Sequence, residues 1–331
     1  MLVDSLGRRI DYLRISVTDR CNLRCIYCMP ENGIQRLGHD EMLRYEEILR
    51  LARIFASLGF NRFRITGGEP LVRKGIVDFV RELSAALPGC DISMSTNGIL
   101  LAEVAAELKR NGLHRVNISL DSVDPHAFAE VTRGGDLNRV LQGIDEALKA
   151  GLVPVKTNTV LMRNVNYGEL PDIAALTLSR PIHVRFIELM PLGEACSRWQ
   201  AGAFVPASEA LAMLRSRFQL RQAVLDGGGP ARYWRIPGAA GTVGFITAVS
   251  SHFCSSCNRV RLTAKGGLAL CLGSNLEVDL RTPMRSGSSD EELRRIIVEA
   301  IRRKPARHHM GEPGNGGGGE YGWREMFSIG G

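Results

Sequence analysis

Three cysteines near the start of the chain have the spacing and the chemistry of a metal site. Cys21, Cys25 and Cys28 form a C-x3-C-x2-C pattern directly after a short apolar segment. Thiolates bind zinc and iron–sulfur clusters, and three of them leave one iron of a four-iron cluster without a protein ligand. Such an open position is a place where a second molecule can react. The alternatives are a zinc knuckle that lacks its fourth ligand and three thiols with no shared role.

A second group of three cysteines lies much further along the chain. Cys254 and Cys257 are followed by Cys271, and His252 is close to them in the sequence. A Cys3His zinc site is one interpretation of this group. A second cluster with an open iron is the sharper interpretation, since the group has no clear fourth cysteine.

Composition and charge bound the kind of protein. The chain has 331 residues, 44% of them hydrophobic, and a formal net charge of +7. We find neither an apolar signal segment nor an unbroken apolar run of the ~18 residues that a membrane span needs. We therefore expect a cytoplasmic protein without a membrane contact, whose cysteines are metal ligands or free thiols. The charge favours an anionic partner, but with 6% aromatic residues and no recognition motif we do not expect nucleic acid.

Short β-branched segments alternate with amphipathic helical segments through the first part of the chain. We expect strands at 13–17, 62–66, 91–95, 115–120, 155–161 and 184–189, with helices such as 45–58 between them. This alternation predicts an α/β fold with a parallel sheet and right-handed crossovers. Six βα units curl into a partial TIM-type barrel, and active residues gather beyond the carboxyl ends of its strands.

The pattern changes near residue 226, where the run Gly-Gly-Gly-Pro at 227–230 interrupts it. We expect a barrel over 1–225 and a C-terminal domain over 226–310 that carries the second cysteine group and closes the open side of the barrel. Residues 311–331 would be a glycine-rich linker and a tail that ends in Gly-Gly.

Two motifs give the chain a resemblance to the radical S-adenosylmethionine (SAM) enzymes. That superfamily has an aromatic residue before the last cysteine of its triad, here Tyr27, and a Gly-Gly-Glu-Pro segment, here at 67–70. The resemblance implies a partial barrel, a 4Fe–4S cluster on the first triad, and SAM on its open iron. The residue types agree, because glycines allow a close backbone approach and Glu69 can accept a hydrogen bond from an ammonium group.

Further motifs narrow the resemblance to one family of radical SAM enzymes, the GTP 3′,8-cyclases. Residues 254–261 read C-x2-C-N-R-x-R as in that family, and residues 11–14, 185–190 and 329–331 are similar to it as well. The resemblance implies a second 4Fe–4S cluster and a reaction in which a 5′-deoxyadenosyl radical takes hydrogen from C3′ of GTP. Bonding of C3′ to C8 of guanine would give 3′,8-cyclo-7,8-dihydro-GTP, the first step toward molybdopterin.

The same resemblance assigns roles to individual residues. It implies cluster ligands at Cys21, Cys25, Cys28, Cys254, Cys257 and Cys271; SAM contacts at Tyr27, Gly68, Ser119 and Met190; GTP contacts at Arg14, Arg64, Ser95, Lys156, Arg259, Val260 and Arg261; and catalytic roles for Arg185, Gly330 and Gly331. Ser95 departs from the threonine that the family often has, and it keeps the hydroxyl. Independently, Arg259 and Arg261 share one face of a strand, where two guanidiniums can bind a triphosphate; a surface pair is the alternative. For the tail the alternative is a frayed terminus.

Partners and competing functions complete the expectations. The resemblance implies GTP as substrate and an external one-electron reductant of the flavodoxin or ferredoxin kind. It also implies a cyclic pyranopterin monophosphate synthase as the next enzyme, and a homodimer is a possible assembly. A radical SAM enzyme acting on tRNA or a peptide would favour more cysteines or an RNA-binding appendage, which the sequence does not show. An electron carrier would coordinate every iron with protein ligands, whereas each group here has three cysteines.

Overall fold

The computed structural model describes residues 2–35, 37–38, 40–225, 229–312 and 325–330. Its central feature is a single sheet whose middle part is parallel. Strands β1 to β6 lie side by side in chain order. Their bounds are β1 Tyr12–Ser16, β2 Arg62–Thr66, β3 Asp91–Thr96, β4 Arg115–Ser119, β5 Lys156–Leu161 and β6 His183–Glu188. Each predicted strand is therefore confirmed to within one residue at either end.

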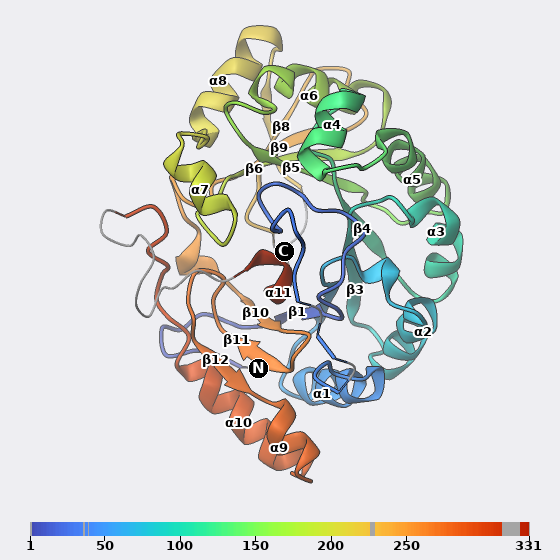
Figure 1. Ribbon diagram of the computed structural model, residues 1–331, viewed down its shortest axis with the longest axis vertical. Helices are drawn as coiled ribbons and strands as arrows, with labels where there is room; N and C mark the ends of the chain where they lie inside the picture. Colours follow the sequence, from blue (N-terminus) through green and yellow to red (C-terminus); the bar gives the residue numbers. More distant parts are fainter. Residues whose placement is uncertain (1, 36, 39, 226–228, 313–324, 331) are drawn as a thin grey trace.

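Helices between these strands cover the outside of the curved sheet (Figure 1). They are α1 Tyr45–Ser57, α2 Ile76–Ala86, α3 Leu101–Arg110, α4 Pro125–Thr132, α5 Leu137–Lys149 and α6 Leu170–Ser179. In α1, Ile48, Ala52 and Phe55 are buried on one face, as their spacing predicts. Gly59 follows with φ +94°, a conformation that glycine adopts without strain where the helix ends.

The remaining strands extend both edges of this sheet. β9 (Thr242–Ile246) pairs in parallel with β6, and β10 (Arg259–Leu262) pairs in parallel with β1. Beyond them β8 (Arg232–Arg235), β7 (Arg221–Ala223), β11 (Gly267–Ala269) and β12 (Glu277–Asp279) add antiparallel ladders. The full order is β12-β11-β10-β1-β2-β3-β4-β5-β6-β9-β8-β7, an open sheet in agreement with the predicted partial barrel.

Five further α-helices lie in the second half of the described chain. They are α7 Ala195–Gln200, α8 Ala207–Arg217, α9 Arg281–Arg285, α10 Asp290–Arg302 and α11 Met326–Ile329. The second half of the chain thus shares its sheet with the first half. The predicted boundary at 226 stays a prediction, and residues 226–228 lie outside the described residues, as does most of the glycine-rich run.

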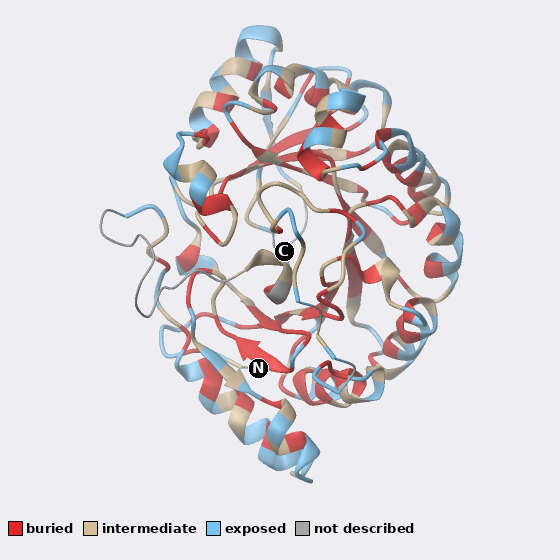
Figure 2. Ribbon diagram, viewed as in Figure 1, coloured by how far each residue is buried: buried red, intermediate tan, exposed pale blue. Residues whose placement is uncertain are grey.

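Burial separates the two faces of the strands. Leu13 and Ile15 of β1 and Phe63 and Ile65 of β2 are fully buried in the hydrophobic core. Figure 2 shows that much of the central sheet is buried in the same way. Because side chains alternate along a strand, the residues between them point to the opposite face, the interior of the barrel. Arg14 of β1 and Arg64 of β2 stand on that interior face.

Candidate functional site

The first cysteine group lies on a loop that leaves the carboxyl end of β1. The amides of Cys28 and Met29 both donate to the carbonyl of Cys25, at 2.9 and 3.0 Å, which closes a tight turn around the triad. Burial, with a smaller contribution from the neighbouring Cys21, raises the pKa of Cys28 to about 12. Burial also raises the pKa of Cys25, with Asp121 and the other two thiols adding to the shift. Half-buried thiols that raise one another's pKa can ionise together only beside a compensating cation, so the triad suits a metal cluster.

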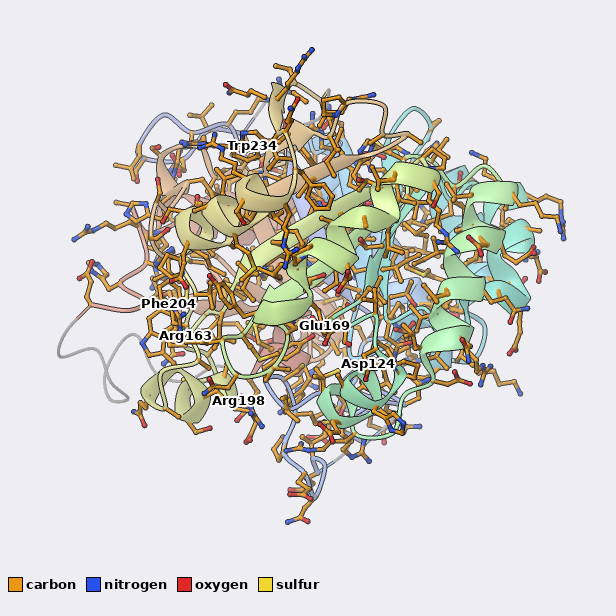
Figure 3. The ribbon with its side chains drawn as sticks, turned by 90° about the horizontal axis from the view of Figure 1, so that it is seen from above. Asp124, Arg163, Glu169, Arg198, Phe204 and Trp234 are labelled. Atoms are coloured by element: carbon orange, nitrogen blue, oxygen red, sulfur yellow. The ribbon has the colours of Figure 1, made fainter. Side chains whose placement is uncertain are left out.

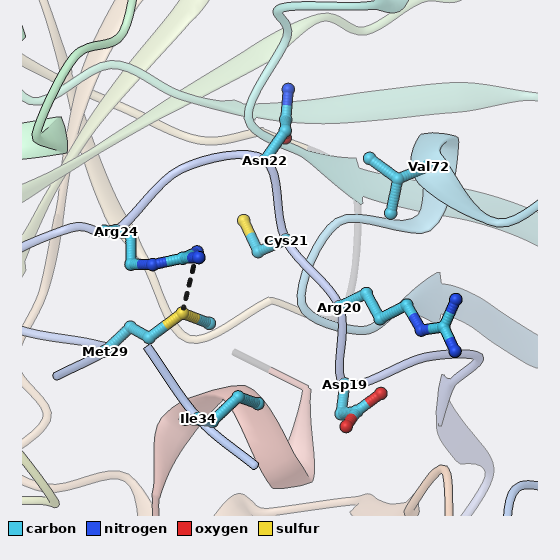
Figure 4. Close-up of a pocket in the computed structure, with 8 residues that line it drawn as sticks. All are labelled: Asp19, Arg20, Cys21, Asn22, Arg24, Met29, Ile34 and Val72. Atoms are coloured by element: carbon cyan, nitrogen blue, oxygen red, sulfur yellow. Dashed lines mark hydrogen bonds between the residues drawn. The ribbon is translucent and has the colours of Figure 1, made fainter. Parts of the chain in front are cut away.

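A cavity of about 220 Å³ opens beside Cys21. Figure 4 shows its lining, and the guanidinium of Arg24 lies 3.7 Å from Sδ of Met29 across it. The lining residues are Asp19, Arg20, Cys21, Asn22, Arg24, Met29, Ile34 and Val72. The cavity therefore gives the first triad room for more than the sulfur atoms alone.

The Gly-Gly-Glu-Pro segment packs directly against the chain that leads into the triad. The amide of Gly68 donates to the carbonyl of Thr18 at 2.7 Å, and that of Glu69 donates to the carbonyl of Arg20 at 2.8 Å. A Cβ atom on Gly68 would lie 2.3 Å from that Arg20 oxygen. The glycine at position 68 thus lets the backbone of the Gly-Gly-Glu-Pro segment pack closely against the backbone of residues 18–20. This packing fixes the position where the cysteine loop begins.

Glu69 is a buried carboxylate with three protein donors. Its oxygens accept hydrogen bonds from the amide of Leu71 (3.0 Å), the hydroxyl of Thr96 (2.8 Å) and the amide of Asn97 (2.6 Å). Burial raises its pKa to about 7, and these donors oppose the rise. Glu69 therefore links the ends of β2 and β3 beside the cysteine loop.

The residues assigned to SAM stand at neighbouring strand ends. The Tyr27 hydroxyl donates to Oδ2 of Asp121 at 2.7 Å, and Oδ1 of Asp121 accepts from the amide of Val160 at 2.8 Å. This ties the triad loop to the region beyond β4 and β5. Ser119 ends β4, Met190 follows β6, and both are half-buried. The roles of Tyr27, Gly68, Ser119 and Met190 toward SAM stay predictions.

A row of cations crosses the interior face of the sheet. In the strand register Arg14 of β1 stands between Arg64 of β2 and Arg261 of β10. Burial, with a smaller contribution from Arg259, lowers the pKa of Arg261 to about 10. Burial also lowers the pKa of Arg185 to about 10. Nε of Arg185 is buried without a hydrogen-bond partner among the described residues. Like charges held out of water in this way are stabilised by a bound anion.

Three other residues predicted to contact GTP flank this row in different ways. Burial lowers the pKa of Lys156, at the start of β5, to about 8, and Arg185 lowers it further. Ser95 is half-buried on β3. Val260 packs in the hydrophobic core with 1% exposure, so only its backbone can reach a ligand.

The second cysteine group is held by buried cations. Cys254 opens a short 3-10 turn, and Cys271 follows β11. Burial raises the pKa of Cys257, but Lys304 and Arg259 outweigh that effect and leave the pKa below its usual value. Nζ of Lys304 donates to the carbonyls of Arg259 (2.9 Å) and Leu270 (2.6 Å), which tethers the segments that carry Cys257 and Cys271.

Arg8 tethers the segment that carries Cys254. Its guanidinium donates to the carbonyl of Cys254 at 2.9 Å and to that of Pro305 at 2.7 Å, while Asp4 holds its Nε at 2.6 Å. The sequence analysis did not single out Arg8 or Lys304. Neither stands in a motif, and only the fold brings them beside cysteines more than thirty residues away in sequence.

The zinc alternative can be compared with the described geometry. Within the described ranges, no three His, Cys, Asp or Glu side chains are grouped to hold a single metal ion. Ligands of one zinc ion stand about 4 Å apart, given the Zn–S bond length, whereas ligands on different irons of a cluster stand further apart. His252 is exposed, with its ring 5.4 Å from that of His308. Among the described side chains, His252 and the three cysteines therefore do not form a Cys3His group around one ion.

The end of the chain returns to the row of cations. Arg261 donates to the carbonyl of Gly330 and, at 3.5 Å, to that of Ile329. A Cβ atom on Gly330 would lie 2.6 Å from Cγ2 of Thr66. α11 accordingly lies near β1 and β10 (Figure 1). Gly331 is outside the described residues.

The fold and the two triads define the class of this protein, a radical SAM enzyme. Residues 15–177 match the Radical SAM superfamily, and residues 182–310 match the family described as Molybdenum Cofactor Synthesis C. A solved structure, of Streptococcus suis SuiB bound to precursor peptide SuiA, has the same fold. It has a TM-score of 0.56 at 12% identity and covers 91% of this chain and 66% of that one.

Curated relatives identify the family more closely. The chain is 50% identical over 335 residues to the GTP 3′,8-cyclase of Desulforamulus reducens, with 100% of both chains covered. It is 54% identical to the GTP 3′,8-cyclase of Heliobacterium modesticaldum, over 95% of this chain and 97% of that one. The chain belongs to the GTP 3′,8-cyclase family. Among its described helices, none has the length and apolar character needed to cross a bilayer.

Proposed function

We propose that this chain converts GTP into 3′,8-cyclo-7,8-dihydro-GTP, using SAM and two 4Fe–4S clusters. The observation that carries the proposal is the alignment of Arg14, Arg64 and Arg261 on adjacent strands, with Arg261 near Cys257 and Cys271 of the second cysteine group. The triphosphate of GTP is the kind of polyanion that such a row binds. Cys21, Cys25 and Cys28 would hold one cluster, and Cys254, Cys257 and Cys271 the other. When bound, the first cluster and SAM supply the one-electron chemistry that starts ring closure.

The chain's own residues bind and orient the substrate. Arg259, Arg261 and Arg14 would hold the triphosphate, and Arg64 and Lys156 would extend the positive surface along β2 and β5. Arg185, whose Nε lacks a partner in the described structure, faces the same interior and would contact the reacting nucleotide. Holding C3′ and C8 within reach makes ring closure a matter of proximity and orientation.

The position of Gly330 extends this proposal to the tail. Its carbonyl accepts from Arg261, so the tail lies next to the proposed substrate site. Gly330 fits beside Thr66 because it lacks a Cβ atom. We infer a supporting role in turnover for Gly330, and for Gly331 after it.

The wider context of the reaction belongs to the same proposal. The chemistry needs an external one-electron reductant, for which a flavodoxin- or ferredoxin-like protein is suited, and its product would pass to a cyclic pyranopterin monophosphate synthase. Such small electron carriers and GTP are cytoplasmic, which is where the enzyme would act. A homodimer is the assembly to look for by light scattering.

Anaerobic incubation with SAM, dithionite and GTP tests the function. We expect mass spectrometry to find a cyclised GTP isomer together with 5′-deoxyadenosine. Alanine at Cys21, Cys25 and Cys28 should abolish both products. Alanine at Cys254, Cys257 and Cys271 should leave some 5′-deoxyadenosine and stop the conversion of GTP. SAM cleavage without any change in GTP, or stoichiometric zinc in the second site, would overturn the proposal.

A further inference from the structure

The carboxyl end of helix α4 is hydrogen-bonded to the first cysteine loop. The amide of Arg24 donates to the carbonyl of Thr132 at 3.0 Å, and the amide of Ile26 donates to that of Val131 at 2.9 Å. The last carbonyls of a helix have no partner within the helix. Here the loop between Cys21 and Cys28 supplies donors for two of them, so the loop and the helix end are built on each other.

Arg133, directly after this helix, has an unusual backbone. Its φ is 53° and its ψ 59°, and it is the one non-glycine residue of the described chain with a positive φ. Glycine is the common residue at a helix end of this kind because a side chain there is strained. Gly134 and Gly135 follow at once, so glycine stands one position too late to relieve the strain. The contacts of the Arg133 side chain must therefore explain why arginine, rather than glycine, stands at this position.

The guanidinium of Arg133 contacts the first cysteine loop. It donates to the carbonyl of Met29 at 2.9 Å and to that of Arg24 at 3.2 Å. These two carbonyls flank the segment that contains Cys25 and Cys28. One cation thus joins both ends of the tightest part of the triad loop.

A second guanidinium contacts the same loop. Nε of Arg198, on α7, donates to the carbonyl of Ile26 at 3.0 Å (Figure 3). Arg133 and Arg198 are close enough that Arg133 lowers the pKa of Arg198, after the larger effect of burial. The chain holds two like charges together at this loop, which is favourable where the loop itself carries negative charge.

We propose that Arg133 is a positioning residue that fixes the loop from Arg24 to Met29 in the conformation the first cluster requires. The inference rests on the proposed function only in taking a cluster to be bound at this triad. The strained backbone is retained because the guanidinium can reach both carbonyls from that position. Arg198 supports the same loop, and Arg133 is the residue whose backbone conformation singles it out.

Two substitutions separate the guanidinium from the strain. Arg133→Ala removes the guanidinium and keeps the strain, whereas Arg133→Gly removes both. Arg139→Gln, which removes an exposed guanidinium on α5, is the matched control. Each is made in the full chain with Cys254, Cys257 and Cys271 replaced by alanine, so that bound iron reports on the first triad. The measurements are the rate of iron loss to a chelator, the electron paramagnetic resonance of the reduced cluster with and without SAM, and the urea midpoint of the apoprotein.

We expect both Arg133 variants to lose iron about tenfold faster than the parent, since each lacks two charge-assisted hydrogen bonds. Their spectra should no longer respond to SAM as the parent does. The apoprotein midpoint of Arg133→Gly should equal or exceed that of Arg133→Ala. Iron retention at the parental rate in Arg133→Gly would overturn the inference, as would iron loss that only follows a lower midpoint. A parent that binds no iron at the first triad would instead contradict the proposed function.

Discussion

Glu69 allows a quantitative test of the electrostatics at the site. Its carboxylate is 1% exposed, and burial raises its pKa from 4.5 to about 7. Since the pKa in the folded state is above that of the unfolded chain, the folded state binds the proton more tightly. Stability is therefore full below pH 4.5 and is lost as the pH rises through about 7. This shift in pKa corresponds to about 3 kcal/mol of unfolding free energy.

Replacement of Glu69 by glutamine removes this dependence on pH. At low pH, where Glu69 is a neutral carboxylic acid, the variant should be about 1–2 kcal/mol less stable than the wild type. The NH2 group of glutamine cannot accept from any of the three donors, whereas the hydroxyl oxygen of the acid still can. Between pH 4.5 and 7.5 the difference should move by about 3 kcal/mol in favour of the variant. The order of stability would then reverse within this range.

Urea unfolding of the apoproteins, followed by circular dichroism at several pH values, measures this difference. Other groups titrate in the same range, Asp121 among them, but they are common to both proteins and cancel in the comparison. Glu107→Gln, at an exposed carboxyl on α3, is the control and should show no such change. A constant difference between wild type and Glu69→Gln would show that Glu69 has the same pKa in the folded and unfolded chains. The three donors would then offset burial completely, and the reasoning from burial would fail.

Three further predictions concern the second half of the chain. Lys304→Met should lower the unfolding free energy of the apoprotein by about 2–4 kcal/mol, because two buried carbonyls lose a charged donor. Lys265→Met, at an exposed site, is the control. Equal urea midpoints for Lys304→Met and the wild type would contradict the role of Lys304. Arg261→Ala should weaken GTP binding roughly ten- to a hundredfold by calorimetry and leave SAM binding unchanged; normal GTP affinity would place the triphosphate elsewhere. Deletion of Gly330 and Gly331 should suppress the formation of cyclised GTP without lowering GTP affinity; turnover at the full rate would leave the tail without a role.

The sequence was sufficient for the parts of the fold that depend on local pattern. Strands β1 to β6 were predicted from short β-branched segments that alternate with helical patterns, and their limits agree with that prediction to within one residue. Side chains alternate between the two faces of a strand, so the sequence also predicts that Arg259 and Arg261 share one face. The structure places Val260, which lies between them, in the core. The family relation, in turn, rested on motifs that carry chemistry.

Long-range contacts could not be obtained in this way. The strand pattern does not indicate that β9 and β10 join opposite edges of the sheet, because pairing depends on which edge is left open once β1 to β6 have assembled. Lys304 and Arg8 look like ordinary surface cations in sequence, yet both are buried beside the second cysteine group. Arg133 likewise shows its importance only through a backbone angle and two carbonyls on a distant loop.

The pairing of β1 with β10 has a consequence for how the protein is made. β1 emerges from the ribosome early, yet one of its edges is covered only when residues 259–262 are available. Until then the nascent barrel presents the open backbone of β1 on one side and that of β6 on the other, and β9 also comes late in the chain. Exposed parallel edges are templates for unwanted association. The growing chain is therefore most vulnerable to aggregation in the interval between the synthesis of β6 and that of β10, which is where chaperone binding should be sought.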